Sequence, residues 1–278
     1  MSIAYFIMAH HKPTMLLRLM NAIYSQDNLY LIHADSKADE VLIELVNHLA
    51  ESNENIRILP SRALSWGGWS LVQVELDAIR YLLSWSGDWN HYINLSGQDF
   101  PLASQTVVSK FLSGHQNNYF LFDKVDPEKV VNLQNRYCIE DIDGFQRIGH
   151  RKPFEQYFSS HIVQYNSSQW RIISRAFAEY ATTSYLSFEM QDYYRYTFLP
   201  DEYFFITLIM NSPFAATVLK KNMRFIRMES TENILRHATT LIMDDIGYLF
   251  NGDALFARKF DDEIDSNVID FIENALLR

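Results

Sequence analysis

The sequence of 278 residues contains little cysteine and little glycine. Its one cysteine, Cys138, cannot form an intrachain disulfide, and no histidine stands beside it, so we expect a structural thiol and not a nucleophile. The nine glycines form no Gly-x-Gly-x-x-Gly fingerprint, no Walker loop and no Gly-x-Ser-x-Gly elbow. Sites for dinucleotides, for P-loop nucleotide binding and for acyl transfer are therefore not expected.

Positive charge and long apolar runs are also scarce. With 24 Lys and Arg against 34 Asp and Glu, the net charge is −10, which argues against a nucleic-acid surface built from clustered cations. The longest apolar runs have about eight residues, fewer than the roughly 20 that span a bilayer. The N-terminus has neither the basic region nor the cleavage site of a signal peptide. These features predict a cytoplasmic protein with no integral membrane segment, and they leave peripheral association with the inner membrane open.

The sequence does contain enough apolar material for a large core, since 48% of its residues are hydrophobic and 14% are aromatic. Near the N-terminus, short apolar runs alternate with stretches of helical periodicity, which is typical of a parallel sheet with crossover helices. The runs are residues 3–9, 29–34 and 55–59. Ligands of such sheets bind beyond the C-terminal strand ends, so we expect the loops at His10, Asp35 and Ser61 to share one rim.

The rest of the chain predicts further elements. Residues 91–95 form another buried run, a helix is expected over 104–112, and residues 255–260 are expected to be irregular. The segment 123–157 has the least regular pattern, and long irregular segments tend to be binding loops, so we expect acceptor contacts there. Because there is no internal repeat or linker, a single domain over residues 1–278 is preferred.

The stretch from Phe198 to Met210 combines a proline with two carboxylates. Pro200 suits the first turn of a helix, and Asp201 and Glu202 suit its positive end. One interpretation is a helix start whose acids complement the dipole. The other is that Glu202 lies at the floor of a cleft, where it takes a proton from an attacking hydroxyl. The local pattern does not separate the two.

Two patterns bear on metal binding. The only Asp-x-Asp triplet is Asp141-Ile142-Asp143, and the run before it is not a clean buried strand. A transferase that binds a metal through this triplet is kept as an alternative. His10 and His11 are adjacent near a strand end, where neighbouring side chains point to opposite faces, so they are poor joint metal ligands. Either histidine could instead hydrogen-bond a nucleotide at the rim, or be structural.

Five motifs stand in order along nearly the whole chain. They are Ile32-His-Ala-Asp-Ser-Lys37, Ser65-Trp with Ser70-x-Val-Gln73, Ile93-Asn-Leu-Ser-Gly-Gln-Asp-Phe-Pro-Leu102, Pro200-Asp-Glu-Tyr203 and Leu255-Phe-Ala-Arg-Lys-Phe-Asp261. In this order they resemble successive signatures of the core-2/I-branching glycosyltransferase family, which also contains the peptide O-xylosyltransferases. Only the region between Asp123 and Ser167 lacks a match.

The resemblance implies a GT-A fold, an α/β architecture with a mostly parallel central sheet flanked by helices. It also implies inverting transfer from a UDP-sugar, with no metal and no other cofactor. On the family's motifs, Glu202 is the catalytic base, Lys259 and Arg236 bind the donor diphosphate, and Asp35 contacts the uridine. Fixed cations can stabilise the leaving diphosphate where another enzyme uses a metal. His10 is a further candidate for contact with the nucleotide.

Three residues are candidates for contact with a donor or acceptor sugar. Asp99 is the acid expected to face the donor sugar, and a capping role before Pro101 is the alternative. Trp66 and Trp170 have aromatic faces that suit pyranose rings, although core packing is the commoner role of tryptophan. A glycoside hydrolase that uses Asp99 and Glu202 as its pair of carboxylates is a further alternative.

The chain also departs from the family pattern. Eukaryotic members are membrane-anchored Golgi enzymes with several disulfides, whereas this chain has one cysteine and no anchor segment. The departure implies a bacterial-type member that acts in the assembly of surface polysaccharide or lipooligosaccharide. UDP-GlcNAc is the first choice of donor and UDP-xylose the alternative, and the acceptor is a hydroxyl of a glycan or glycolipid. A non-catalytic protein that binds nucleotide or glycan is the alternative from another class.

Overall fold

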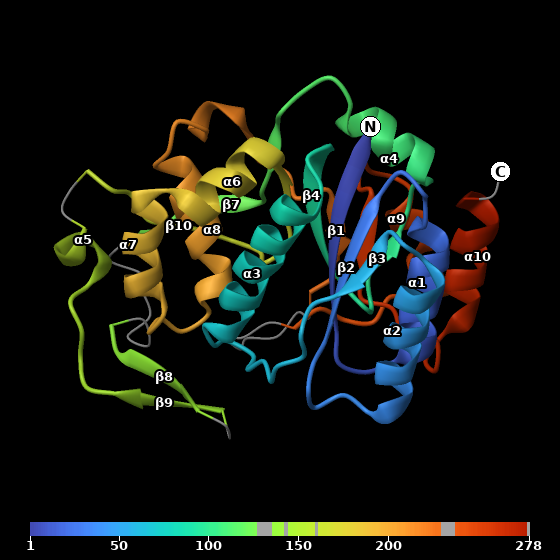
Figure 1. Ribbon diagram of the computed structural model, residues 1–278, viewed down its shortest axis with the longest axis horizontal. Coiled ribbons are helices and arrows are strands. Elements are labelled where there is room, and N and C mark those ends of the chain that lie inside the picture. Colours follow the sequence, from blue (N-terminus) through green and yellow to red (C-terminus); the bar gives the residue numbers. More distant parts are fainter. Residues whose placement is uncertain (127–134, 142–143, 159–160, 229–236, 277–278) are drawn as a thin grey trace. The chain divides into compact units, whose positions relative to one another are not determined.

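Figure 1 shows the computed structural model of the chain, which describes residues 1–126, 135–141, 144–158, 161–228 and 237–276. Contacts within the chain divide it into two compact units, and we describe each by itself. Unit 1 comprises Met1–Ser61, Asp88–His115 and Asn222–Arg278, and unit 2 comprises Arg62–Gly87 and Gln116–Lys221. The expectation of a single domain stays a prediction.

Unit 1 is built around four parallel strands in the order β4-β1-β2-β3. β1 is buried from Ile3 to Ala9, as expected for a parallel strand covered on both faces. α2 packs against β2 and β3, and α1 packs against α2. The elements are β1 (Ser2–Ala9), α1 (Pro13–Ile23), β2 (Leu29–Ala34), α2 (Glu40–Ser52), β3 (Ile56–Ile58), β4 (Trp89–Ser96), β5 (Phe100–Pro101), α4 (Gln105–Leu112), β13 (Arg224–Ile226), η4 (Met243–Asp245), α9 (Ile246–Leu249), β14 (Phe256–Arg258) and α10 (Ser266–Leu276).

A second sheet in unit 1 has the order β13-β14-β5. β14 runs parallel to β13 and antiparallel to β5. Residues 255–260 therefore include a strand, and the expectation that they are irregular is wrong. The flanking hydrogen bonds join residues far apart in sequence: Leu255 N donates to Met223 O at 3.0 Å, and Leu102 N donates to Leu255 O at 2.8 Å. Such pairing leaves no local signal in a strand this short.

Unit 2 has a core of packed helices. α3 packs against α6, α6 packs against α7 and α8, and α7 packs against α8. β6 pairs with β11 antiparallel and with β12 parallel. The elements are α3 (Ser70–Trp85), β6 (Asn118–Tyr119), β7 (Phe122–Lys124), β8 (Tyr137–Asp141), β9 (Gly144–Ile148), α5 (Phe154–Tyr157), β10 (Tyr165–Ser167), β11 (Ile172–Ser174), α6 (Arg175–Thr183), α7 (Tyr185–Tyr194), η2 (Pro200–Glu202), α8 (Phe204–Met210), η3 (Ala215–Thr217) and β12 (Val218–Leu219).

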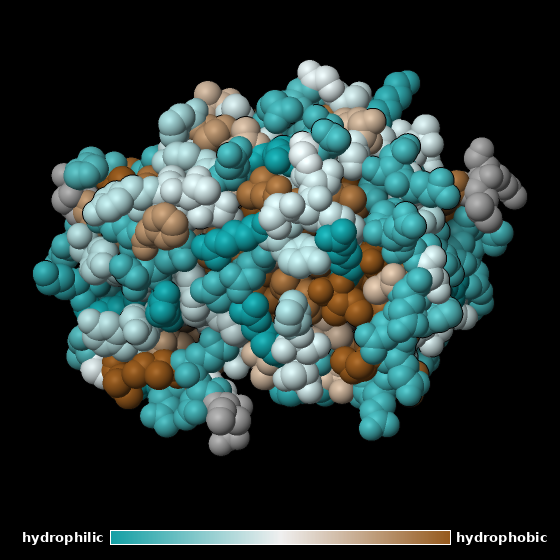
Figure 2. Space-filling model, in the orientation of Figure 1, coloured by the Kyte–Doolittle hydropathy of each residue, from teal (hydrophilic) through white to brown (hydrophobic). Residues whose placement is uncertain are grey.

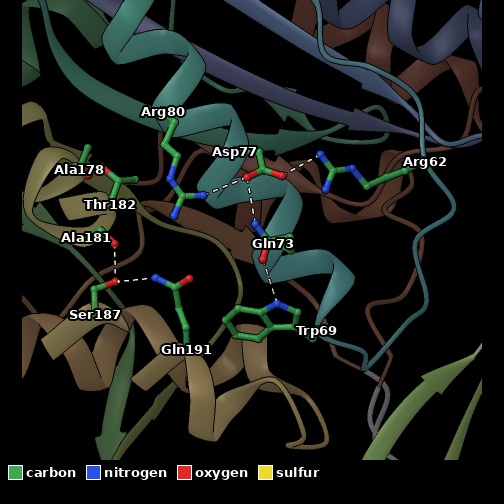
Figure 3. Close-up of polar contacts among 10 residues, drawn as sticks. All are labelled: Arg62, Trp69, Gln73, Asp77, Arg80, Ala178, Ala181, Thr182, Ser187 and Gln191. Atoms are coloured by element: carbon green, nitrogen blue, oxygen red, sulfur yellow. Dashed lines mark hydrogen bonds and ion pairs between the residues drawn. The ribbon is translucent and has the colours of Figure 1, made fainter. Parts of the chain in front are cut away.

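A chain of polar contacts follows α3 (Figure 3). Trp69 Nε1 donates to Gln73 Oε1 at 3.1 Å, and Gln73 Nε2 donates to Asp77 Oδ1 at 2.9 Å. Asp77 also pairs with Arg62 at 2.8 Å and with Arg80 at 3.0 Å. Trp69, which immediately precedes α3, and Gln73 and Asp77 on the helix are spaced four positions apart and so lie on one face. The contacts connect the chain entering α3, through Arg62, to the body of the helix.

The predicted α/β architecture, with a mostly parallel sheet flanked by helices, is confirmed by these elements. Two details differ from expectation. The segment 123–157 contains the antiparallel β8–β9 hairpin and is more regular than its sequence suggested. The predicted helix after Pro200 begins instead with the 3-10 turn η2, and α8 starts only at Phe204 because Tyr203 departs from helical geometry at φ −121°.

Candidate active site

The rim of the sheet in unit 1 brings together loops from three strands. β1 lies between β2 and β4, so the direction of strand order reverses at β1, where ligands of open α/β sheets bind. Ala9 is level with Ala34 on β2, and Met8 is level with Ser96 on β4. The loops that begin after these strands therefore start at the same edge, as predicted for His10 and Asp35.

The side chain of Asp35 is held in place at this rim. It is buried, and its Oδ1 accepts a hydrogen bond from Lys37 N at 2.8 Å. The backbone N–H of Asp35 donates to Ala9 O at 2.8 Å, which ties the ends of β1 and β2 together. A fixed carboxylate at a strand end can accept hydrogen bonds from the hydroxyls or the imide of a nucleoside. The predicted contact with uridine stays a prediction.

His10 is electrostatically coupled to the same rim. Desolvation lowers the pKa of His10, and the neighbouring His11, Lys37 and Arg258 lower it further, whereas Asp35 opposes them. The imidazole is therefore neutral near pH 7, and one ring nitrogen can accept a hydrogen bond. Arg258, at the end of β14, is the weakest of these influences.

Asp99 is wholly buried and paired with a cation. Its Oδ1 accepts a hydrogen bond from the hydroxyl of Ser96 at 2.7 Å and lies 3.2 Å from Arg258 Nε. Burial raises the pKa of Asp99, while Arg258 and Arg224 oppose that rise. The Asp99 carboxylate is closed to solvent. This burial fits a role in holding Arg258 in place better than the predicted contact of Asp99 with a donor sugar.

Three cations lie along the small sheet of unit 1. Arg258 is mostly buried, and desolvation lowers the pKa of its guanidinium, whereas the charge of Asp99 raises it. Lys259 is half-buried, and its backbone oxygen accepts a hydrogen bond from Leu241 N at 2.9 Å. Arg224 is buried on β13 and donates from Nη2 to Asn94 O at 2.7 Å. The other predicted diphosphate ligand, Arg236, lies outside the described residues.

Unit 2 holds the segment that carries Glu202. Leu199 adopts the left-handed backbone region at φ 56°, a conformation that costs about 1–3 kcal/mol in a residue other than glycine. Arg171 Nη2 donates to Asp201 O at 3.0 Å, and Arg171 Nη1 pairs with Glu75 at 3.0 Å in a fully buried ion pair. Arg171, which directly precedes β11, thus holds the turn η2 from its buried side and is itself paired with Glu75 of α3.

The two carboxylates of this turn have different environments. Asp201 is buried, and burial raises its pKa to about 6 although Arg171 opposes the rise. Glu202 is half-buried, and burial together with the charge of Asp201 raises its pKa to about 8. A carboxylate poised near neutral pH is a more effective proton acceptor than an ordinary one. The chemistry of Glu202 therefore suits general-base catalysis.

The two candidate tryptophans of unit 2 differ in exposure. Trp66 is 53% exposed, and its ring packs edge-on against Phe198, with the ring centroids 5.9 Å apart. The predicted contact of Trp66 with a sugar stays a prediction. Trp170 is only 5% exposed, which fits the alternative of core packing and leaves no open face for a pyranose ring.

The metal alternative rests on Asp141 and Asp143. Asp141 is exposed at the end of β8, and Asp143 lies outside the described residues. Within the described part of the chain, no group of three or more His, Cys, Asp or Glu side chains is arranged to hold a metal ion. Cys138 on β8 is buried, and burial raises the pKa of its thiol, as expected for a structural cysteine.

Comparison with known proteins decides the family. The sequence profile described as "Branch: Core-2/I-Branching enzyme" matches residues 3–246. The chain belongs to the Core-2/I-branching enzyme family. This is the family of glycosyltransferases that the five motifs resemble, and membership together with the parallel sheet identifies the predicted GT-A fold.

Curated relatives of this Core-2/I-branching protein are named xylosyltransferases. A xylosyltransferase of Ciona intestinalis is 29% identical over 99% of the chain, and human xylosyltransferase 2 is 32% identical over 80% of it. The chain spans 34% and 26% of the length of these two proteins. Among solved structures, the galactosyltransferase LgtC has a TM-score of 0.45 at 10% identity, with 100% of this chain and 97% of the other covered.

The sequence did not point to several buried residues near the rim of unit 1 and near the turn η2 of unit 2. Arg224, Arg171 and Glu75 are buried charges, and residue type alone gave no reason to place them in the interior. Arg171 and Glu75 are 96 positions apart, so their pairing had no local signal. The ion pair of Arg258 with Asp99 joins residues 159 positions apart in the sequence, so it too had no local signal.

Proposed function

We propose that this Core-2/I-branching protein is an inverting, metal-independent glycosyltransferase that uses a UDP-sugar. The observation that carries the proposal is the half-buried carboxylate of Glu202, whose pKa is raised to about 8, in the turn that matches the family's base motif. Family membership supports the reaction class. UDP-GlcNAc is the first choice of donor. UDP-xylose is the second, and it is favoured by the names of the curated relatives.

The reaction is a single displacement at the anomeric carbon. The acceptor hydroxyl oxygen forms the new bond, its proton passes to the carboxylate of Glu202, and the bond from the anomeric carbon to the UDP oxygen breaks. UDP leaves with that electron pair. Lys259 and Arg236 bind the leaving diphosphate, and Arg258, oriented by Asp99, adds positive charge to the donor site. Because attack comes from the face opposite UDP, the anomeric configuration inverts.

The setting of the reaction is part of the proposal. Among the described residues, no helix has both the length and the apolar character needed to cross a membrane. We place the enzyme in the cytoplasm of a bacterium, where it transfers sugar to a glycan or glycolipid during the assembly of surface polysaccharide or lipooligosaccharide. The net charge of −10 agrees with an acceptor other than nucleic acid.

Calorimetric titration with UDP in EDTA tests the metal-free donor site. The wild type is expected to bind, and Lys259→Ala is expected to weaken binding by about 10- to 100-fold, because each charge-assisted hydrogen bond contributes roughly 1.5–3 kcal/mol. Lys110→Ala, which removes an exposed lysine of α4, serves as the matched control and should bind as the wild type does. Binding that appears only when manganese is added would instead favour the Asp141 and Asp143 alternative.

The pH dependence of transfer tests the role of Glu202 separately. A general base must be ionised, so kcat/KM is expected to rise with pH through an apparent pKa of about 8 and to level off above it. The pKa of an unperturbed glutamate is about 4.3. A profile that is already flat between about pH 6 and 9 would contradict a base with a raised pKa.

A further inference from the structure

The β8–β9 hairpin presents one face to solvent and the other to the protein. Tyr137 pairs with Ile148 and Glu140 pairs with Phe145, so alternate residues of the two strands share a face. The outer face carries exposed apolar side chains, among them Ile139 at 40% and Ile148 at 46% exposure, and Figure 2 shows hydrophobic side chains over this hairpin at the lower left. Glu140 belongs to the opposite face, which contacts two other loops of unit 2.

The first contact is at the N-terminus of α3. Oε2 of Glu140 accepts a hydrogen bond from Ser70 N at 2.8 Å, although the two residues are 70 positions apart. The preceding N-cap residue, Trp69, makes no side-chain capping bond, so Glu140 supplies the cap and its charge complements the helix dipole. The carboxylate lies so close to Gly68 that a Cβ there would be 2.7 Å from Glu140 Cδ. A side chain at position 68 would therefore require the Glu140 carboxylate to move.

The second contact joins this loop to the segment that carries Glu202. Gly67 O accepts a hydrogen bond from Leu199 N at 2.9 Å, and Leu199 O accepts one from Glu202 N at 3.1 Å. A Cβ on Gly67 would lie 2.8 Å from the ring of Phe198. The loop before α3 therefore packs directly on the left-handed residue that precedes the turn η2.

The hairpin also contacts that segment directly. The guanidinium carbon of Arg147 lies 4.5 Å from the centre of the Phe198 ring, and the Phe145 and Phe198 ring centroids are 5.3 Å apart. Cys138 N donates to Tyr196 O at 2.9 Å. One hairpin thus holds both the loop before α3 and the segment before Pro200.

We propose that Glu140 is a positioning residue for the transfer reaction. Its carboxylate fixes the Trp66–Gly68 loop, and that loop fixes the turn on which Glu202 stands. The proposal rests on the function proposed above for its kinetic consequences. It assigns a role to an acid in the segment of the chain that lacks the family's motifs, and it links the position of the Glu140 carboxylate to the absence of a side chain at Gly68.

Kinetics of Glu140→Ala, Glu140→Gln and Glu155→Ala test this role. Glu155 is an exposed acid on α5 and serves as the control for loss of one negative charge. Glu140→Ala is expected to lower kcat by about 10- to 100-fold, since a small displacement of a reacting group is enough for such a loss. Glu140→Gln keeps an acceptor oxygen for Ser70 N and is expected to recover most of the activity.

The pH profile separates positioning from simple support of the fold. If the loop releases the turn, Glu202 gains hydration, and the apparent pKa in kcat/KM should fall from about 8 toward the ordinary range of glutamate. A structural role alone would reduce the amount of active enzyme and leave the profile where it is. An unshifted profile, or a Glu140→Ala variant no slower than Glu155→Ala, would overturn the proposal.

Gly68→Ala provides an independent route to the same displacement. The added methyl would overlap the Glu140 carboxylate, so this variant should reproduce the kinetic defect in the wild-type background. In the Glu140→Ala background the methyl has room, so its further effect on kcat should be less than about threefold and the two changes non-additive. If the two changes instead lowered kcat independently, so that their effects multiplied in the double variant, they would not act through the same displacement of the Glu140 carboxylate.

Hydrogen exchange distinguishes failure of this proposal from failure of the proposed function. Backbone amides of residues 66–72 and 198–204 should exchange faster in Glu140→Ala than in Glu140→Gln or Glu155→Ala, whether or not a donor sugar is known. If Glu140→Ala exchanges faster but the wild type has no transferase activity, the proposed function is wrong and the structural role of Glu140 is retained. Equal exchange in all variants would show that Glu140 does not hold these loops.

Discussion

Replacing Glu202 with glutamine is expected to lower glycosyl transfer by about 10²- to 10⁴-fold, the usual contribution of a positioned general base. Glutamine keeps the size and the hydrogen-bonding oxygen of the side chain but cannot take the proton of the acceptor hydroxyl. The effect should appear in kcat and kcat/KM together, because proton transfer occurs only on the way to the transition state.

The same variant should bind UDP as the wild type does. Lys259 and the ion pair of Arg258 with Asp99 belong to unit 1, whereas Glu202 belongs to unit 2 and is not part of the predicted donor diphosphate site. Asp192→Asn, a change to a carboxylate on α7, is the matched control and should keep both activity and binding. Transfer by Glu202→Gln at more than about a tenth of the wild-type rate would remove Glu202 as the base.

Breaking the buried pair of Arg171 and Glu75 is expected to have the largest effect on stability. Arg171→Met leaves Glu75, which is 1% exposed, without the cation that compensates its charge, and it removes the donor to Asp201 O. Loss of one partner of such a pair typically costs about 3–5 kcal/mol of the free energy of unfolding. Urea unfolding monitored by tryptophan fluorescence should show the shift in midpoint.

The double variant Arg171→Met with Glu75→Leu sharpens this prediction. With both charges removed, no uncompensated ion remains in the interior, and at least half of the lost stability is expected to return. The guanidinium of Arg171 also lies 4.2 Å from the centre of the Phe205 ring. If this packing were the main contribution of Arg171 to stability, the double variant would be as unstable as the single variant, and that result would contradict the prediction.

The sequence predicted the elements whose signal is local and strong. The buried strands β1, β2 and β4 appear as continuous apolar runs, and α1 and α10 each show a clear apolar stripe. The sequence also pointed to Glu202, because Pro200 and the two acids that follow it precede an apolar run. The raised pKa of Glu202 could not be predicted from the sequence, because it depends on burial and on the neighbouring Asp201.

Contacts between distant segments account for most of what the sequence could not show. β14 is three residues long and is defined by its pairing with β5 and β13. The roles of Asp99 and Glu140 follow from partners at Arg258 and Ser70, and neither pairing produces a periodic or spaced pattern in the sequence. Trp66 and Trp170 illustrate the same limit, because residue type alone does not reveal that only the first is exposed.

Release of UDP from a donor sugar in EDTA would show directly whether Glu202 catalyses transfer without a metal. We would measure it with UDP-GlcNAc and with UDP-xylose for the wild type and for Glu202→Gln, with methyl β-galactoside, methyl β-glucoside and methyl α-mannoside as acceptors. We expect acceptor-dependent release from at least one donor by the wild type and none above background by the variant. Tight UDP binding with no release from either donor would contradict it, and would make the protein a non-catalytic nucleotide-binding member of its family.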